Sequence, residues 1–150
     1  MKTVIAYYSK HHGNTKKLLD AIAAVDDVKL IDVTVIKTAD LSRYDRIGFA
    51  SGIYYGAFAK QVQDFARSSL PENKPVFLIE TCGGPRKGYF SAMEKIAEEK
   101  HCKVIGEYEC LGFDTFGPFK LVGGIQKGHP TEEEINKVVL FYKWLQENTR

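Results

Sequence analysis

The sequence lacks the features by which several large classes of protein are recognised. It has only three cysteines, Cys82, Cys102 and Cys110, and no CxxC spacing, so neither a disulfide framework nor a zinc site is predicted. The formal charge is only +2 and no long lysine or arginine run occurs, which gives no electrostatic basis for nucleic-acid binding. The first apolar run, residues 4–8, is too short for a signal peptide or a membrane span. We therefore expect a cytoplasmic protein that binds no metal, no nucleic acid and no membrane.

The chain is long enough for one domain over residues 1–150, with a full hydrophobic core. Short apolar runs alternate with segments in which apolar residues recur at spacings of three and four, which is typical of helices with one buried face. The apolar runs are residues 4–8, 28–32, 47–50, 76–79 and 104–108. Their alternation with helices predicts an α/β fold with an open, doubly wound parallel sheet. In such a sheet, ligands bind beyond the carboxyl ends of the strands.

The last helix has a clear start signal in the sequence "PTEEEINKVV". Thr131 and Glu134 have the spacing of a capping box, and Glu132 and Glu133 suit the positive end of a helix dipole. We therefore expect a helix to begin just after Thr131.

A polar loop with one glycine follows the first strand and leads into the first predicted helix. It contains neither the GxGxxG fingerprint nor the GxxxxGK[ST] loop. Backbone N–H groups at a helix start, together with the helix dipole, form an anion site. The loop therefore either binds a terminal phosphate monoester or simply caps the helix. The candidate binding residues are Ser9, Lys10, His11, His12, Gly13, Asn14 and Thr15.

Two further loops carry candidate binding residues. The loop after the third strand should place two tyrosines on a glycine-rich turn, where they could stack on a planar ligand or cover a helix. Its residues are Ser51, Gly52, Ile53, Tyr54, Tyr55 and Gly56. The loop after the fourth strand could approach a ligand edge through its backbone. Its residues are Thr81, Cys82, Gly83 and Gly84. A long glycine- and aromatic-rich segment, residues 111–130, is expected to be a functional loop.

Two other classes of protein with this topology are excluded, because the residues that their sites require are absent from the matching loops. A phospho-receiver needs an acidic pair after the first strand and an aspartate after the third, where this chain has Tyr8, Ser9 and Ser51. A low-molecular-weight phosphatase needs a cysteine and an arginine in the first loop, and neither is present.

The segments "YYSKHHGNT", "DLSRYDRIGFASGIYYG" and "ETCGG" together resemble the flavodoxin family over essentially the whole chain. This resemblance implies a five-stranded sheet of order 2-1-3-4-5 and noncovalent FMN. It also implies that residues 9–15 hold the phosphate, and that residues 52–56 and 81–84 flank the isoalloxazine ring. We expect a monomer or weak dimer that shuttles electrons to redox partner proteins or a small acceptor, without a catalytic residue of its own.

Two alternatives stay open at this point. One is an FMN-dependent NAD(P)H:acceptor reductase of the quinone type, and the other is a binding module that has kept the fold and lost the flavin. The chain also departs from the family by having Lys10, His11 and His12 where small hydroxyl residues are usual, and by being slightly basic. Cys82 could be a thiolate favoured by Arg86 and Lys87. We expect instead that its small side chain simply lets the backbone approach a ligand.

Overall fold

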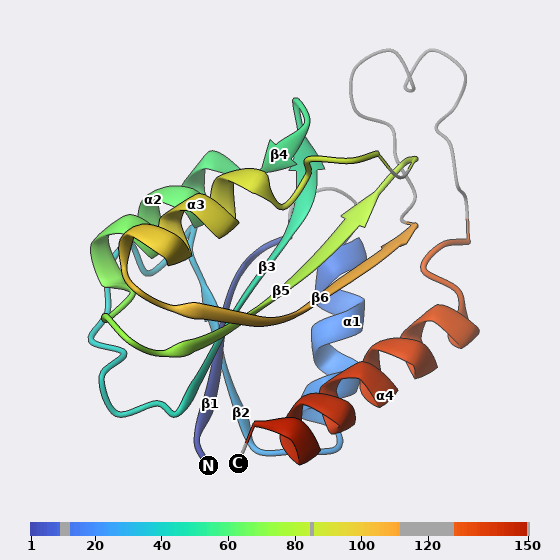
Figure 1. The fold of residues 1–150 in the computed structure, drawn as a ribbon. Helices are drawn as coiled ribbons and strands as arrows, with labels where there is room; N and C mark the ends of the chain where they lie inside the picture. The colour runs from blue at the N-terminus through green and yellow to red at the C-terminus, as the bar shows by residue number, and fades with distance from the viewer. Residues whose placement is uncertain (10–12, 85, 112–127, 150) are drawn as a thin grey trace.

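The computed structural model describes residues 1–9, 13–84, 86–111 and 128–149 (Figure 1). Strands and helices alternate along most of this chain, as the sequence pattern predicted. The elements are β1 (Thr3–Tyr8), α1 (Asn14–Ala23), β2 (Val28–Asp32), β3 (Arg46–Tyr54), β4 (Ala57–Phe58), α2 (Lys60–Ser69), β5 (Pro75–Cys82), α3 (Ser91–Glu99), β6 (Lys103–Leu111) and α4 (Glu132–Asn148).

The sheet has the order β2-β1-β3-β5-β6, and these five strands pair in parallel. The two-residue strand β4 is an addition that pairs antiparallel with the end of β3. Without it, the order is the 2-1-3-4-5 order of the predicted fold, which is therefore confirmed. The strands reach further toward their carboxyl ends than the apolar runs, because ladder pairing continues through Gly52↔Thr81 and Cys82↔Leu111.

Helices cover both faces of the sheet, and each face has its own core (Figure 1). Helices α2 and α3 lie on one face, where Val62, Phe65 and Ile96 pack against strand residues such as Phe49. Helices α1 and α4 lie on the other face. Their core contains the buried residues Ile5, Leu18, Leu19, Ile22, Phe77, Ile79, Val138, Tyr142 and Leu145. Burial on both faces explains why the central strands are almost wholly apolar.

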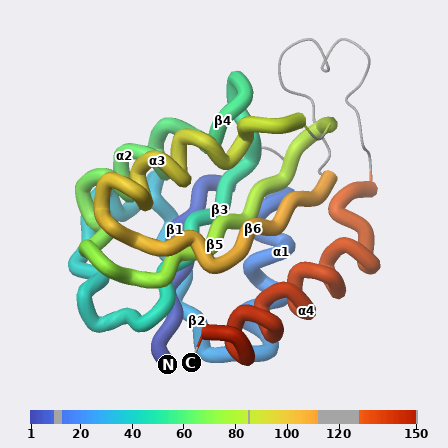
Figure 2. The backbone as a smooth tube through the Cα atoms, in the orientation of Figure 1, coloured from blue at the N-terminus to red at the C-terminus, as the bar shows by residue number. Residues whose placement is uncertain are grey.

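The order of the strands places a topological switch point beside β1. The chain passes from β1 to β2 on one side and later to β3 on the other, so the connections leave the carboxyl ends of β1 and β3 in opposite directions. This is where an open α/β sheet has its binding crevice. At the opposite edge of the sheet, the end of α4 lies beside the start of β1 (Figure 2), and Arg46 Nη1 donates to Thr149 Oγ1 at 3.1 Å.

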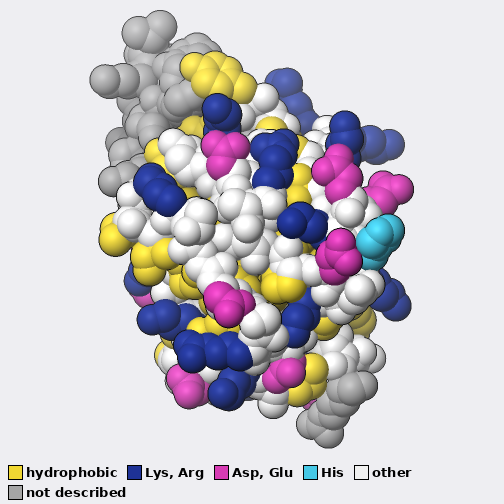
Figure 3. Space-filling view, turned by 90° about the vertical axis from the view of Figure 1, so that its left-hand side faces the viewer, with side chains coloured by type: hydrophobic (Ala, Val, Ile, Leu, Met, Phe, Trp, Pro, Cys, Tyr) yellow, Lys and Arg dark blue, Asp and Glu magenta, His cyan; other side chains and the backbone are white. Residues whose placement is uncertain are grey.

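The described helices include none that is both long and apolar enough to cross a bilayer. On the face shown in Figure 3, basic and acidic side chains are interspersed, and neither sign forms a continuous field.

Candidate functional site

The first predicted loop leads into α1 through a glycine in a left-handed conformation. Gly13 is the N-cap residue, with φ 65°, and among the described residues a Cβ atom there would meet no atom within 4 Å. Open space together with positive φ is the geometry in which glycine lets a backbone approach a ligand. Ser9 Oγ accepts a hydrogen bond from Lys16 N at 3.0 Å, so this hydroxyl also caps the helix. Residues 10–12, and with them Lys10, His11 and His12, lie outside the described residues.

The first turn of α1 is joined to the end of β5 by two threonines. Asn14 and Thr15 are buried, with exposed fractions of 7% and 1%. The Oγ atoms of Thr15 and Thr81 lie 2.9 Å apart and share a hydrogen bond. The predicted first and third loops therefore meet. Because Thr15 is bonded to the protein itself, its backbone is better placed than its hydroxyl to face a ligand.

The second predicted loop is a hairpin. Tyr54 is the last residue of β3 and not part of a turn, which corrects the sequence expectation, because its pairing with Ala57 extends the strand. Tyr55 and Gly56 form the turn, with φ 52° and 80°, and Tyr55 is 93% exposed. The Tyr54 ring packs edge-on against Tyr8, with ring centroids 5.5 Å apart.

An opening of about 420 Å³ lies beside this hairpin. Its lining residues are Tyr8, Tyr54, Tyr55, Ala57, Phe58, Ala59, Lys60, Gln61 and Gln63. The hairpin therefore presents aromatic surface next to a space that can take part of a planar molecule.

Ser51 has a structural role that sequence reasoning did not assign to it. It is fully buried, and its Oγ accepts from Ala59 N at 2.9 Å and donates to the Gly52 carbonyl. The hydroxyl thus holds the start of α2 against β3. Beyond it, Gly52 and Ile53 are half-buried members of the same strand.

The third predicted loop begins later than expected, because Thr81 and Cys82 belong to β5. Gly83 and Gly84 follow, and the Tyr89 hydroxyl donates to the Gly84 carbonyl at 2.9 Å. Arg86 and Lys87 are exposed on this loop. The long segment expected after β6 lies outside the described residues over 112–127.

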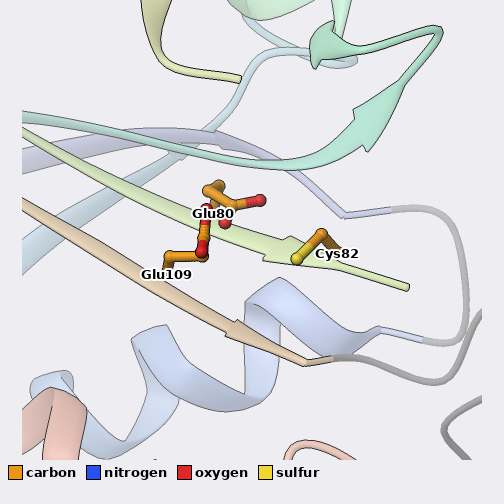
Figure 4. Close-up of side chains that lie close together, drawn as sticks. All are labelled: Glu80, Cys82 and Glu109. Carbon is orange, nitrogen blue, oxygen red and sulfur yellow. The ribbon is translucent and has the colours of Figure 1, made fainter. Parts of the chain in front are cut away.

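The surroundings of Cys82 argue against the alternative in which Arg86 and Lys87 favour its thiolate. Its thiol lies with the carboxyl groups of Glu80 and Glu109, and the donor atoms of the three residues are within 4.8 Å of one another (Figure 4). Burial, and then these two carboxylates, raises the pKa of the Cys82 thiol. Cys82 is therefore a protonated, 5% exposed thiol and not an activated nucleophile.

Glu80 is the residue that sequence reasoning missed. It is 0% exposed and lies in β5 directly before Thr81. Burial, followed by the neighbouring Glu109 carboxylate, raises its pKa to about 9. A glutamate that ends the otherwise apolar run "VFLIE" was the available sign, because a buried acid is rare unless it has a partner or a function.

The carboxyl edge of the sheet thus brings together the start of α1, the β3–β4 hairpin and the end of β5 (Figure 1). Thr15 and Thr81 are 66 residues apart in the chain, and the parallel pairing of β1, β3 and β5 aligns the segments that carry them. The site combines a helix N-terminus, an exposed aromatic turn and a glycine-containing loop. Such a site can bind a planar molecule that carries an anionic group.

Comparison with known proteins agrees with this fold. The chain is 34% identical to an uncharacterized protein of Methanocaldococcus jannaschii, over 99% of this chain and 100% of that one. Among solved structures, an archaeal flavodoxin is similar with a TM-score of 0.72 and 17% identity, over 98% of both chains. The Streptococcus pneumoniae flavodoxin is similar with a TM-score of 0.64 and 19% identity, over 99% of both chains.

General stress protein 14 of Treponema denticola, solved in complex with FMN, is similar with a TM-score of 0.66 and 12% identity over 100% of both chains. The sequence model of the flavodoxin domain matches residues 4–104 of this chain. The resemblance found in the sequence is thereby confirmed, and the chain belongs to the flavodoxin family.

Proposed function

We propose that this chain binds FMN noncovalently and transfers electrons through it. The observation that carries the proposal is that the Gly13 helix start and the exposed Tyr55–Gly56 turn follow the carboxyl ends of the neighbouring strands β1 and β3. The first feature suits a phosphate and the second suits a flavin ring. Family membership and the FMN named with the Treponema denticola structure support the same cofactor.

The residues present fit this cofactor. No described atom outside the chain neighbours of the left-handed Gly13 would meet a Cβ placed there, which suits a phosphate at the positive end of α1. Tyr55 projects a ring that is almost wholly exposed, beside the 420 Å³ opening. The backbone of Gly13–Thr15 would hold the phosphate, while Tyr55 and the Gly83–Gly84 backbone would flank the ring.

Bound FMN would supply the electron chemistry, and this chain would supply orientation and shielding. The Thr15–Thr81 contact fixes the helix start relative to β5, so the phosphate and ring regions keep a constant separation. The Ser51–Ala59 hydrogen bond fixes the hairpin relative to α2. Redox partner proteins or a small electron acceptor would approach at the exposed Tyr55 edge.

The proposal is tested by comparing FMN with riboflavin, which lacks the phosphate. We expect the apoprotein to bind one FMN per chain and to bind riboflavin much more weakly, as measured by flavin fluorescence quenching. Asn14→Ala should weaken FMN binding by about ten- to hundredfold, because hydrogen bonds to charged groups contribute about 1.5–3 kcal/mol. Thr15→Ala should weaken it less, because the Thr15 hydroxyl bonds to Thr81 and its loss only loosens the helix start. Riboflavin binding should change little in either variant.

Thr81→Ala is the matched control, since it removes the partner of Thr15 without altering the helix start. If Thr81→Ala weakens FMN binding as much as Thr15→Ala does, Thr15 acts only through the Thr15–Thr81 contact. Equal affinities for FMN and riboflavin would overturn the phosphate site. NAD(P)H oxidation by the reconstituted protein, with a quinone as acceptor, would favour the reductase alternative over the electron carrier.

A further inference from the structure

Three potential metal ligands converge at the carboxyl end of β5, outside the set that the sequence indicated. Glu80 and Cys82 are two residues apart in β5 and therefore point to the same face of the sheet. Glu109 in β6 is the ladder partner of Glu80. Figure 4 shows the two carboxyl groups facing each other, with the Cys82 thiol further along β5. One oxygen of each carboxyl group and the sulfur lie within 4.8 Å of one another.

The carboxylate of Glu80 has no partner suited to its burial. It is fully buried, and neither of its oxygens has a hydrogen-bond partner of normal geometry among the described residues. No lysine or arginine in the described part of the chain forms a salt bridge with Glu80 or Glu109. With no charge among the described residues to compensate it, burial raises the pKa of Glu80 and keeps this group protonated at neutral pH, and a bound cation would displace that proton. Glu80 points at a second carboxylate, so a cation between them would compensate both.

The donor set selects the kind of cation. Two carboxylates and one thiol are a mixed oxygen and sulfur set, which suits a borderline divalent metal such as Zn²⁺ better than Mg²⁺ or Ca²⁺, which prefer oxygen alone. Zinc ligands at about 2.0–2.3 Å from the metal lie about 3.5 Å apart. Glu109 is exposed and its side chain can turn, so the three donors can close to this separation.

We propose that Glu80, Cys82 and Glu109 form a binding site for a zinc-class divalent cation. This revises the sequence expectation that the chain binds no metal. The cation would replace the thiol proton of Cys82, as coordination does for cysteine ligands generally. The site lies directly before Gly83 and Gly84, so a bound cation would place positive charge at the base of that loop.

Cobalt is a suitable probe, because Co²⁺ takes zinc sites and reports its ligands by absorption. Chelator-treated full-length protein should bind one Co²⁺, with visible tetrahedral bands and a near-ultraviolet sulfur-to-metal band, and Zn²⁺ should displace both. Cys82→Ser should abolish the sulfur-to-metal band. Glu80→Gln should weaken Co²⁺ binding by at least about tenfold, because a ligand is lost.

Cys102→Ser is the matched control, since Cys102 is a buried cysteine that contacts Pro71 and Lys74 instead of a carboxylate. Its cobalt spectrum should equal that of the natural protein. Zn²⁺ should also raise the melting temperature of the natural protein but not of Glu80→Gln, and circular dichroism checks that each variant is folded. The proposal is overturned if no sulfur-to-metal band forms, if Cys82→Ser keeps it, or if Cys102→Ser loses it. Because the readout needs no flavin, it is independent of the FMN proposal.

Discussion

In this chain, the type of a residue predicts where in the fold it lies better than it predicts which atoms its side chain bonds to. Ser9, Thr15 and Ser51 all lie at the carboxyl edge of the sheet, where a ligand-binding hydroxyl was expected. In the structure, the Ser9 hydroxyl accepts from Lys16, that of Thr15 pairs with Thr81, and that of Ser51 bonds to Ala59 and Gly52. Each hydroxyl joins two segments of the site, so their first effect is to fix its geometry.

The most strained residue of the site gives a prediction at this scale. Tyr55 has φ 52° while being 93% exposed, and aromatic residues disfavour this region, whereas asparagine tolerates it in two-residue hairpins. Tyr55→Asn should therefore raise the free energy of unfolding of the apoprotein by up to about 1 kcal/mol, measured by urea denaturation. The same variant should bind FMN more weakly, because the stacking ring is lost.

Gly56→Ala is the comparison, since φ is 80° there and the space in front of the Cα is open. Backbone strain alone should lower its stability by about 1 kcal/mol. If Tyr55→Asn is instead less stable than the natural protein, the Tyr55 ring is packed for the fold and not kept for a ligand.

At the scale of elements, the last helix shows how a local signal and a distant contact combine. The capping box expected from Thr131 and Glu134 is confirmed, because Thr131 Oγ1 accepts from Glu134 N at 3.2 Å and Glu134 Oε1 accepts from Thr131 N at 2.9 Å. The same glutamate also accepts from Leu111 N at 3.2 Å, which joins the helix start to the end of β6. The cap could be predicted from four adjacent residues, whereas the link to β6 could not.

Further along α4, the buried Tyr142 makes the stability of the fold depend on pH. The Tyr142 hydroxyl donates to Asp26 at 2.6 Å, and burial, followed by this hydrogen bond, raises the pKa of Tyr142 to about 12. The folded state therefore keeps the phenol proton between pH 10 and 12, while the unfolded state loses it. The stability from this group is complete below pH 10 and is lost as pH rises through 12, by up to about 3 kcal/mol.

Tyr142→Phe lacks this titration. The natural protein should be more stable than Tyr142→Phe by about 1 kcal/mol at pH 8, and the difference should shrink and reverse between pH 10 and 12. Urea denaturation across this range measures it. A constant difference would show that the phenol titrates alike in both states.

For the whole molecule, close packing at the centre of the sheet limits which side chains can be enlarged without loss of stability. Gly48 lies in β3, and a Cβ atom there would come within 2.4 Å of the Phe77 ring of β5. Both Phe77 and its helix-side neighbour Tyr142 are fully buried, with ring centroids 6.2 Å apart, so the ring has little room to move. Gly48→Ala should destabilise the protein by about 1–3 kcal/mol through overpacking.

A second substitution separates overpacking from loss of strand geometry. The double variant Gly48→Ala, Phe77→Leu should lose less stability than the sum of the losses in the two single variants. The smaller side chain at position 77 leaves room for the methyl group added at position 48. Strictly additive effects in urea denaturation would show that the ring is not what rejects the added methyl group.

The sequence by itself determined the fold class, because hydrophobic periodicity and capping signals are local. The alternation of apolar runs with helical stripes indicated the parallel sheet, and the three loops at its carboxyl edge were indicated by glycine, hydroxyl and aromatic residues. The sequence did not reveal that Tyr54 continues β3, because strand length depends on pairing with a neighbouring chain segment.

Tertiary structure alone decided the environment of Cys82. In the sequence, the nearest ionisable groups after it are Arg86 and Lys87, which left a stabilised thiolate open as an alternative. In the fold, strand register places Glu109 beside Glu80, so the charges nearest the sulfur are negative. Electrostatic interaction depends on distance in space and on burial, and neither can be read from separation along the chain.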